Sequence, residues 1–171
     1  EIHLITVPTG RKTPPIVVTE DEHPRPDTTL EGLAKLKPLF EGGVVTAGNA
    51  SGINDGAAAL LVGSRAVGER AGAKPLVRIL SSAAAGVEPR IMGIGPVGAI
   101  KKALARAGLT LADMDIVEIN EAFASQVLSC LKLLEIDFED SRVNPNGGAI
   151  AVGHPLGASG ARLALTVARE L

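Results

Sequence analysis

The stretch Asn144-Pro-Asn-Gly-Gly-Ala-Ile-Ala-Val-Gly-His-Pro-Leu-Gly-Ala-Ser-Gly160 places one histidine, His154, among glycine and alanine residues. Glycine has no Cβ, so a ligand or a second segment can approach such a tract closely. Pro155 suits the first turn of a helix, and the run from there to Leu171 is apolar on nearly every face. A titratable side chain delivered at the start of a buried helix is typical of an active-site group. The alternative is a glycine-rich turn with an incidental histidine.

The composition narrows the class of protein. The 171 residues are 46% hydrophobic with no Trp and no Tyr, so a sizeable core must be built from aliphatic side chains. The formal net charge is −2 and long basic blocks are absent from the sequence, which argues against nucleic acid as a partner. No apolar run reaches the roughly 18 residues of a membrane span. The single cysteine excludes an internal disulfide and fits a reducing compartment, so we expect a cytoplasmic protein.

The first residues read as the middle of a strand. Residues Glu1 to Val7 begin without Met and lack the layout of a signal peptide. We therefore expect the chain to start inside a larger protein.

Strand-like and helix-like segments alternate, which predicts an α/β fold with a parallel sheet. The predicted strands are Ala57–Val62, Leu76–Ser81 and Asp115–Ile119, and the predicted helices are Ser64–Ala71, Pro96–Ala107, Glu121–Leu134 and Pro155–Leu171. Ahead of them, residues 1–27 hold two extended pieces, and Thr28-x-x-Glu31 has the pattern of a capping box opening a short helix. The last helix is apolar on more sides than these three strands could pack against. Together with the strand-like start of the chain, this indicates that the fold includes further segments.

Gly93-Ile-Gly95-Pro-Val-Gly98 matches the letters of the dinucleotide-binding fingerprint. That fingerprint follows a strand directly, whereas here the preceding predicted strand ends more than ten residues earlier. Pro96 also lacks an amide that a pyrophosphate would need. We interpret this motif as a loop that leads into a helix with Pro in its first turn.

Two polar motifs stand at junctions between elements. Asn120-Glu-Ala-Phe123 lies where a predicted strand ends and a helix begins, a place where ligands gather in open α/β sheets. Taken alone, this motif favours Asn120 as a helix N-cap, a purely structural role. Thr46 to Gly56 is a loop rich in Gly and Asn, for which the alternative is a cluster of turns. Because Asn120 and His154 both precede helices and both have small neighbours, we favour a shared site.

The remaining candidates are interpreted as structural. Cys130 lies on the apolar side of its predicted helix, where a thiolate would not be stabilised, so we expect a core residue. His3 and His23 lie in extended, Pro-flanked segments, and we expect both at the surface without partners.

The tracts Val45 to Ala57, Asn120 to Phe123 and Gly147 to Gly160 resemble the thiolases in order and spacing, and Met92-Gly-Ile-Gly-Pro96 fits as well. The likeness covers essentially all 171 residues. It is specific, because related condensing synthases typically have His at the position of Asn120. A ketoacyl synthase is therefore disfavoured.

The resemblance implies the C-terminal half of a five-layered αβαβα fold, with a mixed sheet, a buried helix after His154 and its last strands missing. Residues 1–43 would end the loop domain that covers the active site, and residues 44–171 would form an incomplete C-terminal core domain. The family's nucleophilic cysteine lies in the first half, and its second cysteine, in a Cys-x-Gly turn, would follow Leu171. The partners implied are the N-terminal thiolase half and further copies in a homodimer or homotetramer.

The chemistry implied is cleavage of a 3-ketoacyl-CoA by CoA, or the reverse Claisen condensation. His154 would donate from its ring to the developing enolate oxygen, and Asn120 would hold a water that supplies the second donor. The resemblance needs no metal or redox cofactor, since coenzyme A is a substrate. The Pro-rich stretch Asp21 to Pro26 favours degradative thiolases, acting on 3-ketoacyl-CoA or 3-ketoadipyl-CoA, over biosynthetic ones.

The resemblance also implies a path for coenzyme A. Ala47, Ala50 and Ser51 would line the pantetheine tunnel, with Ser51 bonding the amide of that arm. Met92 and Phe123 would lie near the acyl end, and Arg25 near the nucleotide phosphates. An alternative function from another class is a thiolase-like module that binds acyl-CoA without catalysis.

Overall fold

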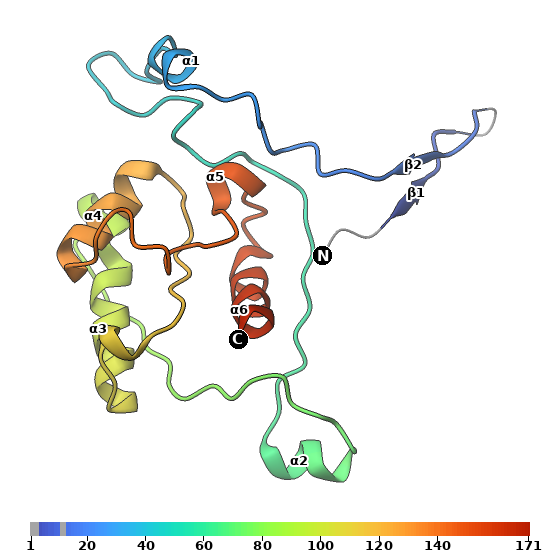
Figure 1. Ribbon diagram of the computed structural model, residues 1–171, viewed down its shortest axis with the longest axis vertical. Helices are drawn as coiled ribbons and strands as arrows, with labels where there is room; N and C mark the ends of the chain where they lie inside the picture. Colours follow the sequence, from blue (N-terminus) through green and yellow to red (C-terminus); the bar gives the residue numbers. More distant parts are fainter. Residues whose placement is uncertain (1–3, 11–12) are drawn as a thin grey trace.

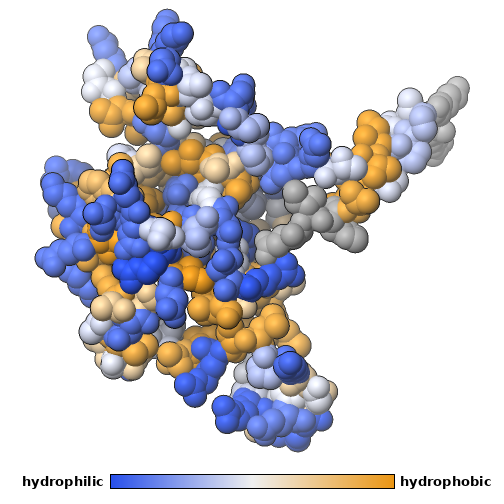
Figure 2. All heavy atoms as spheres, in the orientation of Figure 1, coloured by the Kyte–Doolittle hydropathy of each residue, from blue (hydrophilic) through white to orange (hydrophobic). Residues whose placement is uncertain are grey.

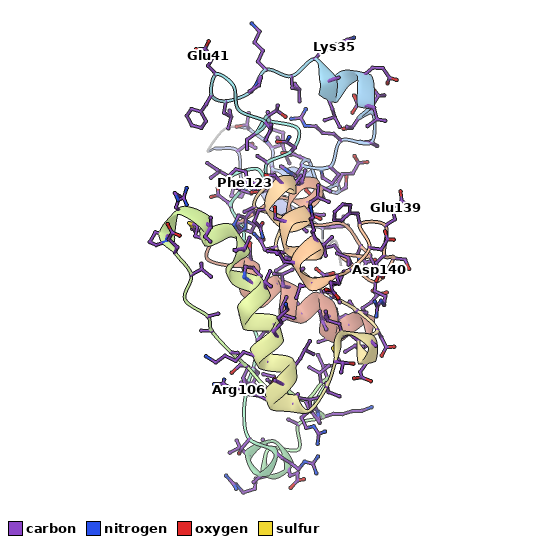
Figure 3. All side chains as sticks on the ribbon, turned by 90° about the vertical axis from the view of Figure 1, so that its left-hand side faces the viewer. Lys35, Glu41, Arg106, Phe123, Glu139 and Asp140 are labelled. Carbon is purple, nitrogen blue, oxygen red and sulfur yellow. The ribbon has the colours of Figure 1, made fainter. Side chains whose placement is uncertain are left out.

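The computed structural model describes residues 4–10 and 13–171. Three views of it show the arrangement of elements (Figure 1), one hydrophobicity-coloured face (Figure 2) and the side chains (Figure 3). The elements in chain order are β1 Ile5–Val7, β2 Ile16–Val18, α1 Leu30–Ala34, α2 Arg65–Arg70, η1 Pro89–Ile94, α3 Gly95–Ala107, η2 Leu111–Asp113, α4 Ala124–Leu134, α5 Ala149–Val152 and α6 Ser159–Glu170, with η marking 3₁₀-helix. In Figure 1, α6 is seen between the pair α3 and α4 and the long extended run that leads to α2.

The N-terminal strands form a small sheet of their own. β1 and β2 pair antiparallel, with Ile5 opposite Val18 and Val7 opposite Ile16. This hairpin projects away from the helices (Figure 1), and the two predicted extended pieces are confirmed in it. Residues 1–3 and 11–12 lie outside the described residues, and so does the surface position predicted for His3.

The predicted strands at 57–62, 76–81 and 115–119 are wrong as strands. The first two segments are not strands in the structure, and the third makes a single parallel bridge between Val117 and Val143. A β-strand requires backbone hydrogen bonds to a neighbouring strand. A hydrophobic run does not by itself provide that neighbour. Side chains in the first two segments are accordingly exposed, Leu61 by 99% and Leu76 by 74%. Figure 2 shows hydrophobic residues gathered in the lower part of the molecule, toward α2.

Helix boundaries follow the local sequence closely at α2 and α3. Ser64 caps α2, because its hydroxyl accepts a hydrogen bond from the Val67 amide at 3.4 Å. Pro96 lies in the first turn of α3 and Gly108 ends the helix in a left-handed conformation with φ 69°. The predicted helix with Pro in its first turn is therefore confirmed. The interpretation of residues 93–98 as a loop is wrong, because Gly93 and Ile94 end η1 and α3 begins directly at Gly95.

Other boundaries differ from those predicted. The cap of α1 is Thr29, whose hydroxyl accepts from the Gly32 amide, whereas the Thr28 hydroxyl donates to Arg25 O at 2.8 Å. The capping-box prediction is thus wrong by one residue. α4 begins at Ala124 rather than Glu121, because Phe123 is extended at φ −145° and ψ 142°. α6 likewise begins at Ser159, four positions after Pro155.

The core is built on α4. Val127, Leu131 and Leu134 are buried against Ile119 and Ile136, and side chains of α3 pack against this cluster. Cys130 belongs to the same buried face with 0% exposure, so its prediction as a core residue is confirmed. Within α6, which the structure describes throughout, Ser159 alone is buried, so this helix is only partly covered by the rest of the chain.

Candidate active site

Three loop segments that are distant in sequence meet at the start of α4. The Ser51 amide donates to Ala122 O at 3.0 Å, and the Ala124 amide donates to Asn49 O at 2.8 Å. Ile53 and His154 form a parallel bridge on the other edge of the 49–54 segment. The structure thus brings together the Asn-rich loop, the Asn120 motif and the His154 tract, which the sequence analysis singled out separately.

Asn120 and His154 face one another at this meeting point. Asn120 Nδ2 lies 3.4 Å from His154 Nε2, and both residues are half-buried. Asn120 is not the N-cap of α4, since that position belongs to Phe123. Its Oδ1 is buried and makes no hydrogen bond within the described residues. A buried amide oxygen without a partner is a group that a bound water or ligand would satisfy.

The second ring nitrogen of His154 is held by Ser159. The Ser159 hydroxyl lies 2.6 Å from Nδ1 and 3.1 Å from Pro155 O. A hydroxyl has one proton, so it donates either to Nδ1 or to Pro155 O. When it donates to Nδ1, the ring proton must sit on Nε2, the nitrogen that faces Asn120. When it donates to Pro155 O instead, its oxygen can accept from Nδ1–H, and Nε2 is then an acceptor toward Asn120. The direction of the Ser159 hydroxyl is therefore linked to which ring nitrogen of His154 carries the proton.

A clamp fixes Asn120 from both sides. The buried Asn144 accepts from the Ile119 amide at 2.8 Å and donates to Ile119 O at 2.9 Å and to the Glu121 carboxylate at 2.8 Å. The Glu121 carboxylate also accepts from the Ile150 amide at 3.2 Å. Both neighbours of Asn120 in the chain are thereby tied to the His154 tract.

The sequence analysis did not select Asn144 or Glu121. The one available signal was the group Asn-Pro-Asn-Gly-Gly at 144–148, which is typical of unusual backbone angles, and Asn144 indeed has φ 46°.

Gly148 makes room for this clamp. A Cβ at Gly148 would collide with the Glu121 carboxyl group. The absence of a side chain, rather than a positive φ, is what the structure requires here, since φ of Gly148 is −105°.

The prediction that His23 has no partner is wrong. His23 is half-buried, with Nε2 3.2 Å from Ile150 O and Nδ1 3.2 Å from Asn54 Nδ2. Its partners lie 127 and 31 positions away, so neighbouring residues could not reveal them. Asn54 in turn accepts from the His154 amide at 3.1 Å.

The residues predicted to bind coenzyme A are not all adjacent. Ala50 bridges to Phe123, and Ser51 bonds the chain beside it, so these three residues lie together. Phe123 is 43% exposed at the start of α4, near the end that faces the α1-bearing segment (Figure 3). Met92, 75% exposed, lies on η1, which packs against α4.

The other two predicted residues lie elsewhere. Ala47 is exposed earlier in the same loop, and Arg25 is exposed in the segment before α1.

The lone cysteine is poorly suited to nucleophilic chemistry. Cys130 Sγ lies 3.3 Å from Gly93 O and 3.6 Å from Gln126 Nε2, inside the core. Burial raises the pKa of its thiol, partly opposed by the bond from Gln126. The described residues also contain no group of three or more His, Cys, Asp or Glu side chains placed to hold a metal ion. Among those residues, no helix combines the length and hydrophobicity that crossing a membrane requires.

Family models cover nearly the whole chain. Residues 73–171 match the C-terminal domain of thiolases and residues 1–66 match the N-terminal domain. The β-ketoadipyl-CoA thiolase of Acinetobacter baylyi is 56% identical over 100% of this chain and 43% of its own length. The acetyl-CoA acetyltransferase of Escherichia coli is 52% identical over 98% of this chain and 42% of its own length.

Solved structures agree with the family models. The Bacillus anthracis acetyl-CoA acetyltransferase superposes with a TM-score of 0.91 at 48% identity, over 99% of this chain and 42% of that one. Human mitochondrial 3-ketoacyl-CoA thiolase in complex with CoA gives 0.80 at 47% identity, over 91% and 39%. The chain therefore has the α/β fold predicted from its motifs, and it spans less than half the length of these relatives. It belongs to the thiolase family.

Proposed function

We propose that the protein containing this chain is a thiolase-type acyltransferase. It would cleave 3-ketoacyl-CoA with CoA to give acetyl-CoA and a shortened acyl-CoA, or run the reverse Claisen condensation. The observation that carries this proposal is the facing pair Asn120 and His154, with 3.4 Å between Nδ2 and Nε2. Two side chains able to donate hydrogen bonds converge from separate segments, as an oxyanion site requires.

The pair would act on developing negative charge. In thiolytic cleavage, a thiolate takes the acyl group as a thioester while the bond to the acetyl-CoA carbon breaks. The electron pair of that bond passes to the thioester oxygen of the departing enolate. His154 Nε2–H would donate to that oxygen, and Asn120 would hold a water that donates beside it.

The nucleophile would come from outside these residues. Cys130 is buried at 0% exposure, and burial raises the pKa of its thiol, so it is a poor source of thiolate. In this proposal residues 1–171 carry the Asn and His half of the site, and alone they are inactive. The N-terminal thiolase half and further copies of the protein are its proposed partners.

Coenzyme A is proposed as a substrate, with no further cofactor. Ala47, Ala50 and Ser51 would line its pantetheine arm, while Met92 and Phe123 would contact the acyl end. Support comes from the bridge between Ala50 and Phe123, which puts small side chains beside the start of α4. Arg25 is the proposed contact to the phosphates. A solved relative, human mitochondrial 3-ketoacyl-CoA thiolase, is itself in complex with CoA.

Substrate class and domain limits are further parts of the proposal. A degradative role, in fatty-acid or aromatic breakdown, is favoured by relatives named β-ketoadipyl-CoA thiolase at 56% identity. Residues 1–43 are proposed to end the loop domain and residues 44–171 to belong to the C-terminal core.

The test uses the complete protein that contains this sequence. Thiolysis of acetoacetyl-CoA and 3-ketoadipyl-CoA is measured for the wild type and for His154→Ala. Loss of an oxyanion donor should lower kcat by about 100- to 1,000-fold with KM little changed. Lys132→Ala, on the exposed side of α4, is the control and should keep wild-type constants. If the wild-type protein binds CoA but shows no turnover, the proposed enzyme function is wrong and the protein is a CoA-binding module.

A further inference from the structure

Asn54 connects the backbone of His154 to a residue far earlier in the chain. Its Oδ1 accepts from the His154 amide at 3.1 Å, beside the parallel bridge between Ile53 and His154. This hydrogen bond requires glycine at position 153, because a Cβ there would lie 2.6 Å from Asn54 Oδ1. Gly153 also has φ 94°, a value that favours glycine. The turn before His154 is therefore shaped around the Asn54 amide.

His23 fixes the orientation of that amide. Asn54 Nδ2 lies 3.2 Å from His23 Nδ1, and His23 Nε2 lies 3.2 Å from Ile150 O. Both contacts are satisfied by one neutral tautomer, in which Nε2–H donates to Ile150 O and Nδ1 accepts from Asn54. The Asn54 amide then presents its oxygen to His154 and cannot rotate without losing both bonds.

A second glycine accommodates the same pair. A Cβ at Gly52 would collide with His23 Cε1 and would lie 2.8 Å from Asn54 Oδ1. His23 and Asn54 thus occupy space left by glycines on two segments, as a packed contact does and a chance surface approach does not.

We infer that Asn54 and His23 are positioning residues for His154. Neither touches the position proposed for the reacting oxygen. They hold the main chain of His154, whereas Asn120 faces its ring, so that Nε2 keeps its 3.4 Å approach to the Asn120 amide. His23 precedes α1 in a segment proposed to cover the site, so this contact also couples that segment to the catalytic turn. The inference rests on the proposed function.

The first measurement is independent of activity. Amide hydrogen exchange at His154, resolved by fragmentation mass spectrometry, reports the bond to Asn54 directly. In the complete protein, Asn54→Ala should speed exchange at that amide by about tenfold, the worth of one hydrogen bond. Asn54→Asp keeps the acceptor and should retain protection. Asn49→Ala is the matched control, since Asn49 bonds only Thr46 and Val44 through its side chain among the described residues.

The second measurement separates positioning from stability. Asn54→Ala should lower kcat for thiolysis by about tenfold with KM within about twofold. His23→Ala should shift both readouts the same way by a smaller factor, and it serves as the test if Asn54→Ala does not fold. Unchanged exchange at His154 in a folded variant overturns the inference. So does unchanged kcat in a variant of an active wild type, whereas an inactive wild type overturns the proposed function instead.

Discussion

The Glu118 carboxylate lies 3.7 Å from the Arg162 guanidinium, joining the chain just before Asn120 to α6, the helix that follows His154. Glu118 is almost fully buried, with 2% of its side chain exposed, while Arg162 is 25% exposed. Both carboxylate oxygens make no hydrogen bond within the described residues. An ion pair without supporting hydrogen bonds repays little of the cost of burying its charge.

This pair gives a prediction for stability against pH. Burial raises the pKa of Glu118 above its usual 4.5, opposed by Arg162 and assisted by the nearby carboxylates of Glu121 and Glu170. Because the folded pKa exceeds the unfolded one, the stability from this group is full below pH 4.5 and is lost as pH rises through the folded pKa. Glu118→Gln is neutral throughout, so its stability relative to wild type should increase with pH above 4.5.

Urea unfolding of the complete protein at a series of pH values measures that difference. Glu139→Gln removes an exposed carboxylate and is the matched control. A stability of Glu118→Gln relative to wild type that decreases with rising pH would contradict the assignment of burial as the dominant effect.

Asn144 is expected to be the most sensitive polar residue of the clamp. Asn144→Ala removes the hydrogen bonds to Ile119 and Glu121. It also places alanine in the left-handed backbone region, at φ 46°, without the side-chain hydrogen bonds that asparagine makes there. A loss of about 2–4 kcal/mol of unfolding free energy follows from the unpaired buried groups and the backbone strain. Asn144→Gly removes the same bonds without the strain.

Urea unfolding compares the two variants directly. Asn144→Gly should be less destabilised than Asn144→Ala by about 1 kcal/mol. Equal losses in the two variants would show that the left-handed backbone contributes nothing.

Sequence patterns predicted the local features of this molecule well. The helix at Pro96–Ala107 and the buried Cys130 depend on residues within a few turns of each other. The motifs around Asn120 and His154 predicted that these residues lie together, and the structure places Asn120 Nδ2 3.4 Å from His154 Nε2.

Long-range partners explain most of what the sequence did not predict. Val117 forms a β-bridge with Val143, and the His23 ring contacts the Ile150 carbonyl oxygen. Neither partner can be predicted from local sequence periodicity. Strand predictions at 57–62 and 76–81 failed for the same reason, because hydrophobicity does not specify which segment will provide a ladder. The start of α4 was misplaced since the extended backbone of Phe123 is set by its bridge to Ala50.

A substitution at Gly148 tests how much the hydrogen bonds of Glu121 contribute to stability. Gly148→Ala puts a methyl group into the space of the Glu121 carboxylate, which must move away from Asn144 and the Ile150 amide. Overpacking with loss of these bonds should cost about 1–3 kcal/mol in thermal unfolding of the complete protein. Gly157→Ala is the control, because a Cβ there meets no atom within 4 Å. Equal stability of the two variants would mean that Glu121 can relocate freely.

Ser159 should matter for the donor nitrogen of His154 more than for substrate binding. Its hydroxyl is 2.6 Å from His154 Nδ1 and the residue is 4% exposed, so water does not readily replace it. The proposed reaction needs a proton on Nε2, which Ser159 favours when its hydroxyl donates to Nδ1. In Ser159→Ala the ring loses that partner, and part of the population carries the proton on Nδ1 instead. We expect kcat for thiolysis to fall about fivefold to tenfold, the worth of one hydrogen bond, with KM little changed. Steady-state kinetics of the complete protein supply both constants. Ser159→Thr keeps a hydroxyl and should recover most of the lost kcat, which a purely structural defect would not allow. A folded Ser159→Ala variant with wild-type kcat would show that His154 keeps its tautomer without Ser159.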